Sequence, residues 1–375
     1  MSQTVHVDPI LLSKVTKPAR YVGGEWNSVV KNHADVKFTV AYAFPDVYEV
    51  AMSHLGLRIL YALLNERDDV AAERVYAPWP DMEAIMREKG YPLYTLETKT
   101  AVRDFDMVGF TLQYEMSFTN ILNMLDLAGI PLWAAERGEE YPLVVGGGPC
   151  AYNPEPLAGY FDLFCLGESE ESVQLLADTV IAWKEAGKPG GKKGLLKVLA
   201  GQEGNYVPSF YRDEYDENGD FLRLVPTEAE AEPVIRKCVV ADEETVFFPT
   251  KPIVPNIDIV HNRAVLELFR GCSRGCRFCQ AGILYRPVRE KTPERLVELA
   301  KEIIANSGYD EISLMSLSSA DYSRLPELVD LLLEAFKGRK VSVSLPSLRV
   351  DSFSVDIAKK VQQVRKSGLT FAPEA

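Results

Sequence analysis

The stretch that decides the fold is LELFRGCSRGCRFCQAG, residues 266–282. A short apolar strand runs directly into Cys272, three residues separate Cys272 from Cys276, and two separate Cys276 from Cys279. Gly271 and Gly275 supply backbone conformations that other residues adopt only with strain. The spacing therefore predicts a tight loop that bends three thiolates toward one point.

This loop offers too few ligands for a closed metal site. A tetrahedral zinc site or an ordinary cubane cluster takes four protein ligands, whereas the loop has three cysteines and no histidine nearby. One position stays open for an outside ligand, and a molecule with an amino and a carboxylate group side by side suits it. The alternatives are a structural zinc knuckle and an electron-transfer cluster, for which Cys150, Cys165 or Cys238 would supply the fourth ligand.

Strands and helices alternate after the loop. Strands are expected at 264–270, 311–315, 341–345 and 369–373. Thr292 suits the N-cap of the first helix, and the apolar side chains that follow recur at helical spacing. Gly308 lies where that helix should stop. The pattern predicts a β/α barrel with the cysteine loop after its first strand.

Together these features resemble the radical S-adenosylmethionine (radical SAM) superfamily, in which an aromatic residue, here Phe278, precedes the third cysteine. The resemblance implies that Cys272, Cys276 and Cys279 hold a 4Fe-4S cluster whose open iron is chelated by SAM. An electron from an external donor would then cleave SAM to a 5′-deoxyadenosyl radical that acts on an unknown substrate. The rival interpretations are the noncatalytic iron–sulfur or zinc protein above and a ligand-sensing module.

The resemblance also implies SAM-binding residues beyond the cysteines. Where relatives carry a Gly-Gly-Glu element, this chain has SLSSADY, so Ser318, Ser319 and Asp321 are expected to contact SAM. Glu374 stands at the position that contacts the ribose, and Arg349 is expected at the same mouth. The arginines within the loop would offset the thiolate charge, or lie in solvent or against another subunit; they are Arg270, Arg274 and Arg277.

The first half of the chain has a different α/β pattern. Buried strands are expected near 38–44, 108–112, 143–145 and 163–166, with helices at 53–66, 120–127 and 168–184. This alternation predicts a doubly wound, flavodoxin- or Rossmann-like domain, which resembles the cobalamin-binding domain of some radical SAM proteins. The glycines at 146–148 indicate either close approach to a ligand or a tight turn. His54 lacks the surrounding D-x-H-x-x-G motif, so it is not assigned as a cobalt ligand, and cobalamin remains an open prediction.

The expected organisation has four parts. Residues 1–19 form an arm, 20–190 the cobalamin-binding-like domain, 191–260 an extended linker with a hairpin at 216–220, and 261–375 the first part of the barrel. The resemblance implies six β/α units, so we expect the chain to be a fragment of a longer polypeptide.

The composition sets limits on the environment and partners of the chain. Its 375 residues are 47% hydrophobic and 25% charged, typical of a globular protein. The net charge of −13 works against nonspecific attraction to nucleic acid. The sequence has no secretory signal and no apolar run long enough to span a bilayer. We therefore expect a cytoplasmic protein with no membrane or nucleic-acid partner.

Overall fold

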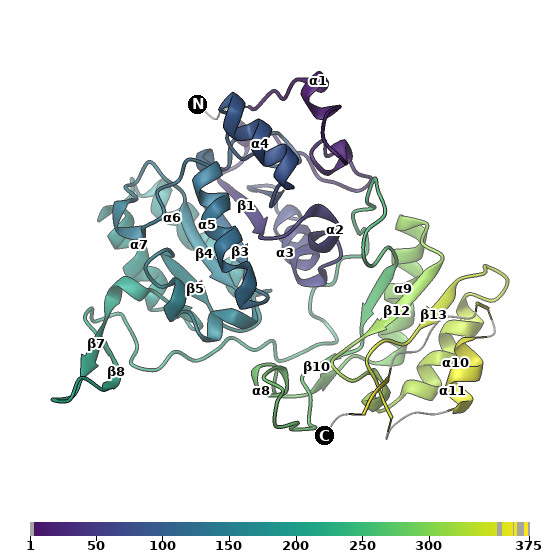
Figure 1. Ribbon diagram of the computed structural model, residues 1–375. Coiled ribbons are helices and arrows are strands. Elements are labelled where there is room, and N and C mark those ends of the chain that lie inside the picture. The colour runs from purple at the N-terminus through teal and green to yellow at the C-terminus, as the bar shows by residue number, and fades with distance from the viewer. Residues whose placement is uncertain (1–3, 351–354, 363, 366–370, 374–375) are drawn as a thin grey trace. The chain divides into compact units, whose positions relative to one another are not determined.

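A computed structural model describes residues 4–350, 355–362, 364–365 and 371–373 (Figure 1). The chain divides into two compact units. The N-terminal unit comprises residues 1–239 and 255–260, and the C-terminal unit comprises residues 240–254 and 261–375. Each unit has its own sheet and core, and each is described separately below.

The N-terminal unit is built on a six-stranded sheet with the strand order β2-β1-β3-β4-β5-β6. The first five strands in this order are parallel, and β6 is antiparallel to β5. Every residue of β1 and β2 is buried, as expected for strands covered on both faces. The strands are β1 Phe38–Phe44, β2 Val70–Tyr76, β3 Met107–Thr111, β4 Leu143–Gly147, β5 Leu163–Cys165 and β6 Asn205–Tyr206.

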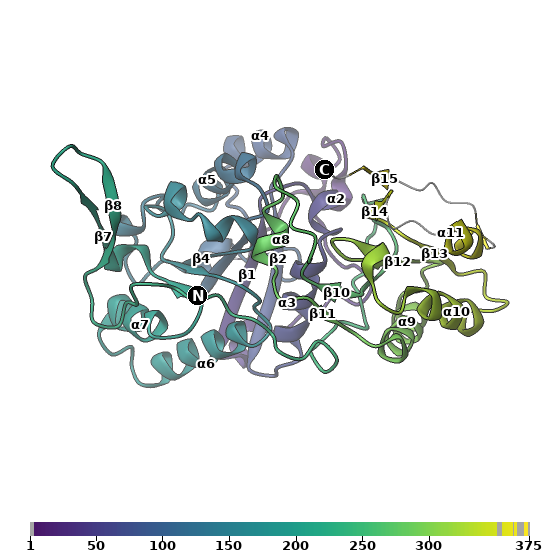
Figure 2. The same cartoon turned by 90° about the horizontal axis from the view of Figure 1, so that it is seen from below.

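Helices cover both faces of this sheet. Figure 2 shows α4 and α5 on one side and α6 and α7 on the other. The fold is thus the doubly wound α/β type that the sequence predicts, with the flavodoxin-like order of its parallel strands. The helices of the unit are α1 Pro9–Leu12, α2 Tyr48–Ala51, α3 Leu55–Asn65, α4 Pro80–Lys89, α5 Phe118–Leu127, α6 Ser172–Glu185 and α7 Gly191–Ala200.

Short 3-10 helices occupy many connections between these elements. They are η1 Pro18–Arg20, η2 His33–Asp35, η3 Val102–Asp104, η4 Glu115–Ser117, η5 Ala134–Glu136, η6 Pro149–Tyr152, η7 Glu155–Leu157 and η8 Pro208–Phe210. Several of them follow strand ends, so they shape the loops at the two edges of the sheet.

Strand β2 was not expected from the sequence, because it carries Arg74 and Glu73 in a fully buried position. The Arg74 guanidinium lies between two carboxylates, 2.8 Å from Glu25 and 2.6 Å from Glu97. His33 lies 2.6 Å from Glu73. A buried charge persists only when it is paired and hydrogen-bonded, so partners distant in sequence allow this charged segment to form a buried edge strand.

The segment 191–260, expected as an extended linker with a hairpin, contributes regular elements to the N-terminal unit. Residues 191–200 form helix α7, and β6 adds to the edge of the main sheet. The expected hairpin is confirmed: β7 Tyr211–Tyr215 and β8 Phe221–Pro226 pair on either side of the turn. The glycines and lysines before 195 start a helix because the apolar side chains of α7 pack inward.

The C-terminal unit contains a parallel sheet in the order β13-β12-β9, with helices α9 and α10 beside it (Figure 1). Two shorter pairs accompany the sheet: β10 with β11, antiparallel, and β14 with β15, parallel. The strands are β9 Ala264–Glu267, β10 Phe269–Arg270, β11 Arg289–Glu290, β12 Glu311–Met315, β13 Ser342–Ser344, β14 Leu348–Arg349 and β15 Phe371–Ala372. The helices are α8 Ala281–Leu284, α9 Pro293–Ser307, η9 Ser319–Asp321, α10 Leu325–Ala335 and α11 Val355–Val361.

The expected β/α alternation is confirmed in this unit. Thr292 caps α9 by accepting a hydrogen bond from the Arg295 amide, and Gly308 ends it in the left-handed conformation. The first expected strand, 264–270, is divided between β9 and β10. The division lets β10 pair with β11 and so close the base of the cysteine loop.

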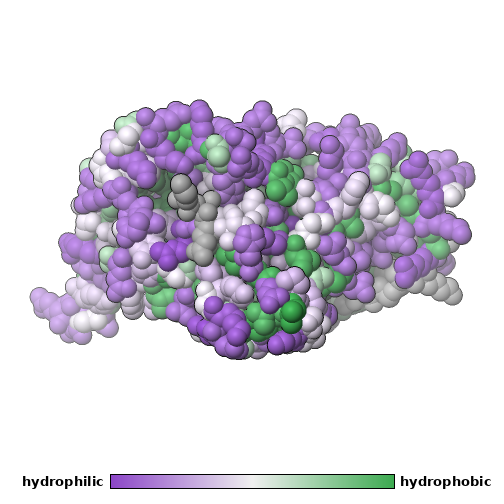
Figure 3. Space-filling model, turned by 90° about the horizontal axis from the view of Figure 1, so that it is seen from above, coloured by the Kyte–Doolittle hydropathy of each residue, from purple (hydrophilic) through white to green (hydrophobic). Residues whose placement is uncertain are grey.

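Hydrophilic side chains cover much of the face shown in Figure 3, with apolar ones between them. In the described part of the chain, no helix has the length and apolar character that crossing a membrane requires.

Replacing Arg74 with methionine should strongly destabilise the N-terminal unit. The substitution leaves the Glu25 and Glu97 carboxylates buried without their cation, which costs roughly 3–5 kcal/mol. Arg87→Met is the control, because Arg87 is 46% exposed and pairs at the surface with Glu83 and Asp126; its loss should cost about 1 kcal/mol or less. Urea unfolding measures both, and equal effects would contradict the account.

Candidate functional site

The three cysteines of the C-terminal unit lie on the loop that connects β10 to α8. All three are free thiols of intermediate exposure. Gly271 has a φ of +89°, and a Cβ there would lie 2.5 Å from the Pro287 carbonyl oxygen, so no other residue fits. Gly275 has a φ of +67°. The glycines thus have the conformational role that the sequence predicts.

One cysteine has a cationic neighbour from another strand. The Arg349 Nη1 lies 3.6 Å from the Cys276 sulfur and donates a hydrogen bond to it. Arg349 is on β14, directly after the third strand of the main sheet. The structure therefore brings the predicted mouth residue Arg349 to the cysteine loop.

The loop is also joined to the segment that follows β12. The Arg274 guanidinium forms a two-pronged ion pair with the Asp321 carboxylate, with 2.7 Å between Nε and Oδ2. Through these hydrogen bonds Arg274 holds the pKa of Asp321 below its usual value, while burial acts in the opposite direction. Asp321 is therefore ionised near neutral pH and lies beside the cysteine loop.

The two serines of the same segment differ in their surroundings. Ser319 is fully buried, and its hydroxyl donates to the Leu314 carbonyl oxygen at 2.9 Å. Ser318 is 2% exposed, and its hydroxyl lies near Asp321 without a hydrogen bond of ordinary geometry. A buried hydroxyl without such a bond is costly. Ser318 thus has bonding capacity left for a ligand, whereas the hydroxyl of Ser319 is already bonded to the backbone.

The remaining expected residues are dispersed. Phe278 is 71% exposed, and Arg277 is exposed. Arg270 points to carboxylates at the base of the loop, 3.0 Å from Glu267. Glu374 lies outside the described residues.

Sequence reasoning missed Glu243 and Lys291, which form a buried ion pair of 2.8 Å beside Arg270. The acidic run at 242–244, in the middle of the long connection between β8 and β9, was the available signal.

The donors of this loop are three cysteine thiols, with Arg349 beside one of them. Across the described ranges, no three or more histidine, cysteine or acidic side chains are arranged to hold one metal ion. The described residues therefore place three thiols on one loop, a cation at one of them, and the buried Ser318 hydroxyl in the segment after β12.

A second site is indicated in the N-terminal unit, at the carboxyl ends of its strands. In open α/β sheets ligands bind at this edge, where the strand order reverses, here between β1 and β3. The three glycines after β4 have different roles. A Cβ on Gly146 would lie 2.9 Å from the Phe164 ring, and Gly148 has a φ of +103°, whereas a Cβ on Gly147 would meet only the Cys165 carbonyl oxygen at 3.7 Å. Only Gly147 leaves room above the edge.

His54 lies near the same edge but is committed to the fold. Its Nδ1 accepts a hydrogen bond from the Leu57 amide at 3.1 Å and caps helix α3. The proton of the neutral ring must then be on Nε2, and the side chain also hydrogen-bonds Gln113. Burial lowers the pKa of His54 to about 4. Both nitrogens are engaged, in line with the sequence reasoning that left His54 unassigned as a cobalt ligand.

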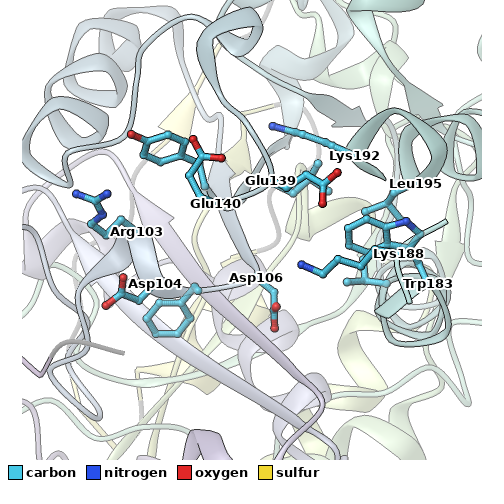
Figure 4. Close-up of a pocket in the computed structure, with 13 residues that line it drawn as sticks. Arg103, Asp104, Asp106, Glu139, Glu140, Trp183, Lys188, Lys192 and Leu195 are labelled. Carbon is cyan, nitrogen blue, oxygen red and sulfur yellow. The ribbon is translucent and has the colours of Figure 1, made fainter. Parts of the chain in front are cut away.

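A pocket of about 270 Å³ lies at the opposite, amino-terminal edge of the sheet (Figure 4). Two of its cations lie over its own aromatic rings: Arg103 lies 5.6 Å from the Tyr141 ring centre and Lys188 lies 5.3 Å from the Trp183 ring centre. A third, Lys192, pairs with Asp162 at 2.8 Å. The pocket is therefore separate from the edge at which α/β sheets bind cofactors.

Comparison with known proteins identifies the class. Residues 56–208 match the family described as radical SAM proteins, N-terminal, and residues 266–373 match the radical SAM superfamily. The chain therefore belongs to the radical SAM superfamily. A domain of this kind implies a 4Fe-4S cluster and SAM as its cofactors.

Two individual proteins resemble the chain over most of its length. An uncharacterised protein of Methanocaldococcus jannaschii is 25% identical over 339 residues, which is 90% of this chain and 60% of that protein. The radical SAM methyltransferase TsrM of Kitasatospora setae, solved with cobalamin and a 4Fe-4S cluster, has a TM-score of 0.53 at 16% identity and shares the fold. That match covers 89% of this chain and 60% of TsrM. The chain thus spans about 60% of the length of both proteins.

Acidification should destabilise the N-terminal unit through His54. The folded-state pKa, about 4, is below the unfolded value near 6.5, so the unfolded state binds more protons between these pH values. Stability should be complete above about pH 6.5 and fall as the pH approaches 4. The difference between the folded and unfolded pKa values corresponds to a loss of roughly 3 kcal/mol by pH 4.

The control is His54→Asn, which retains a capping acceptor but does not titrate. The difference in unfolding free energy between the two proteins, measured in urea from pH 7 to pH 4, should change with pH. Parallel pH profiles would contradict the assignment of His54 as a buried neutral cap.

Proposed function

We propose that this chain carries the catalytic centre of a radical SAM enzyme, with Cys272, Cys276 and Cys279 as the ligands of a 4Fe-4S cluster. One observation carries the proposal: three free, partly exposed thiols lie on one loop that contains Gly271 and Gly275. Arg349 donates a hydrogen bond to the middle one, Cys276. Reduced and in contact with SAM, such a cluster supplies the electron that cleaves the sulfonium to methionine and a 5′-deoxyadenosyl radical. The substrate and the external electron donor are not identified.

The protein's own residues have three tasks in this proposal. The Arg274–Asp321 ion pair fixes the cysteine loop against the segment after β12. The Asp321 carboxylate and the Ser318 hydroxyl are polar groups of that segment with capacity to bind the amino group of SAM. Arg349 offsets the negative charge of the thiolates. Ser319, Phe278 and Glu374 remain proposed contacts without a described bond to the site.

Reconstitution under anaerobic conditions tests the proposal. The chain, loaded with iron and sulfide and reduced with SAM present, should release 5′-deoxyadenosine, and Cys276→Ala should abolish the release because the cluster loses a ligand. Cys238→Ala is the matched control: it removes a thiol of the N-terminal unit that donates to the Glu203 carbonyl oxygen. If the Cys276→Ala variant still releases 5′-deoxyadenosine, or if the cluster-loaded parent releases none, the proposal of a radical SAM enzyme is wrong.

The polar segment after β12 gives a separate prediction. Asp321→Asn should weaken SAM binding about tenfold or more, because a charge-assisted hydrogen bond contributes roughly 1.5–3 kcal/mol. The control is Ser323→Ala, a nearby position whose hydroxyl bonds Glu290 instead. Equilibrium dialysis of labelled SAM with the cluster-loaded protein measures both, and equal affinities would remove Asp321 from the site.

We further propose that the N-terminal unit binds a corrinoid at the carboxyl edge of its sheet. The flavodoxin-like strand order and the open space above Gly147 support this, and TsrM, which shares the fold, was solved with cobalamin. Asp46 and Tyr114 add polar groups at the ends of β1 and β3, with 3.2 Å between the Tyr114 hydroxyl and the carboxylate. Since His54 is engaged in the fold, the corrinoid would bind without a cobalt ligand from His54.

A side chain placed above the edge should block this binding. Gly147→Val is expected to weaken hydroxocobalamin affinity about tenfold or more, roughly 1.4 kcal/mol, because the branched side chain fills the space that the ring would occupy. Gly201→Val, at the exposed end of α7, is the control. Titration followed by visible absorbance measures the affinities. If Gly147→Val binds hydroxocobalamin as tightly as the parent, the corrinoid does not bind above Gly147.

A further inference from the structure

Basic residues concentrate at the base of the cysteine loop. Strands β10 and β11 pair there, with Phe269 opposite Glu290 and Arg270 opposite Arg289, so they close the two ends of the loop. Lys291 follows directly, and its amide donates to the Leu268 carbonyl oxygen at 3.0 Å. Three cations thus meet at the base of the loop.

Glu243 lies at the centre of these cations. Its Oε2 is 2.8 Å from the Lys291 ammonium. Its Oε1 is 3.5 Å from Arg270 and 3.5 Å from Arg289, and it forms no hydrogen bond of ordinary geometry with either. One carboxylate therefore faces three positive groups.

The burial of this group makes the pairing necessary. The side chains of Glu243 and Lys291 are each 1% exposed. Charges removed from water persist only when opposite charges compensate them. Glu267 is the second carboxylate in the group, 3.0 Å from Arg270 and 3.6 Å from Lys291. Two negative and three positive groups leave a net charge of +1, and loss of Glu243 would leave +2.

Glu243 comes from the connection between the two main sheets, not from the barrel pattern itself. The same connection makes three further hydrogen bonds, one with Arg289 at the far end of the loop and two with Thr292 at the start of helix α9. The Arg289 guanidinium donates to the Val240 carbonyl oxygen, and Glu244 accepts hydrogen bonds from the Thr292 amide at 2.9 Å and hydroxyl at 2.6 Å. Residues 240–244 therefore bind the segment that leads from β11 into helix α9.

We propose that Glu243 is a positioning residue of the cysteine loop: as the counter-ion of Arg270, Arg289 and Lys291 it holds the two ends of the loop together and lowers the positive potential at the thiols. This inference rests on the proposed function for its effect on the cluster. Its effect on the loop is independent of any cofactor.

Glu243→Gln tests the inference because it preserves size and removes the charge. Glu244→Gln is the matched control. It also removes one negative charge, but from the neighbouring carboxylate, which is bonded to Thr292 and not to the three cations. In the cluster-free chain, tryptic cleavage within residues 271–288 should be about tenfold faster in Glu243→Gln. Glu244→Gln should stay within about twofold of the parent.

The double variant Glu243→Gln, Lys291→Met provides a second test. It removes one charge of each sign, so slow cleavage should return even if the single variant folds poorly. A double variant cleaved as fast as the single, or a single variant as resistant as the parent, would overturn the role of Glu243 as counter-ion.

The cluster-loaded protein gives the second readout. The added positive charge stabilises the reduced cluster, so its midpoint potential should be higher in Glu243→Gln than in the parent and in Glu244→Gln. An unchanged potential would overturn the electrostatic part of the inference. If the parent takes up no cluster, the proposed function fails, and the cleavage rates of the cluster-free chain still decide the role of Glu243.

Discussion

The central constraint on the C-terminal unit is electrostatic: three thiols have to be held on one short loop in a form that binds metal. The backbone supplies the turn through Gly271, whose conformation excludes any side chain. Cations supply the charge balance, with Arg349 at Cys276 and a buried group at the base of the loop. Since unpaired buried cations are unstable, carboxylates from outside the loop complete the arrangement.

Both units place their polar groups at the carboxyl ends of parallel strands. In the C-terminal unit these groups follow β9, β12 and β13, and in the N-terminal unit Asp46 and Tyr114 follow β1 and β3. The carboxyl ends of parallel strands lie at the same edge of a sheet, so the loops that follow them are close in space although distant in sequence. The same geometry explains how one chain can carry the proposed cluster site on one sheet and the proposed corrinoid site on another.

Local patterns carried most of what the sequence predicted. The cysteine spacing, the Thr292 cap and the hairpin at 216–220 depend on neighbouring residues, and the structure has the last two as expected. Strand β2 was missed because Arg74 is stabilised by Glu25 and Glu97, which no local pattern reveals. Two other contacts also join residues that are far apart in the sequence. Glu243 and Lys291 are about 50 residues apart, and Arg349 and Cys276 are about 70 residues apart.

The most direct test of the account is magnetic resonance of the reduced, cluster-loaded chain with SAM isotope-labelled in its amino and carboxylate groups. The account predicts hyperfine coupling from both groups to a cubane held by three cysteines, because one iron has no protein ligand. A cluster spectrum that SAM leaves unchanged, or a loop that takes up zinc in place of iron, would contradict it.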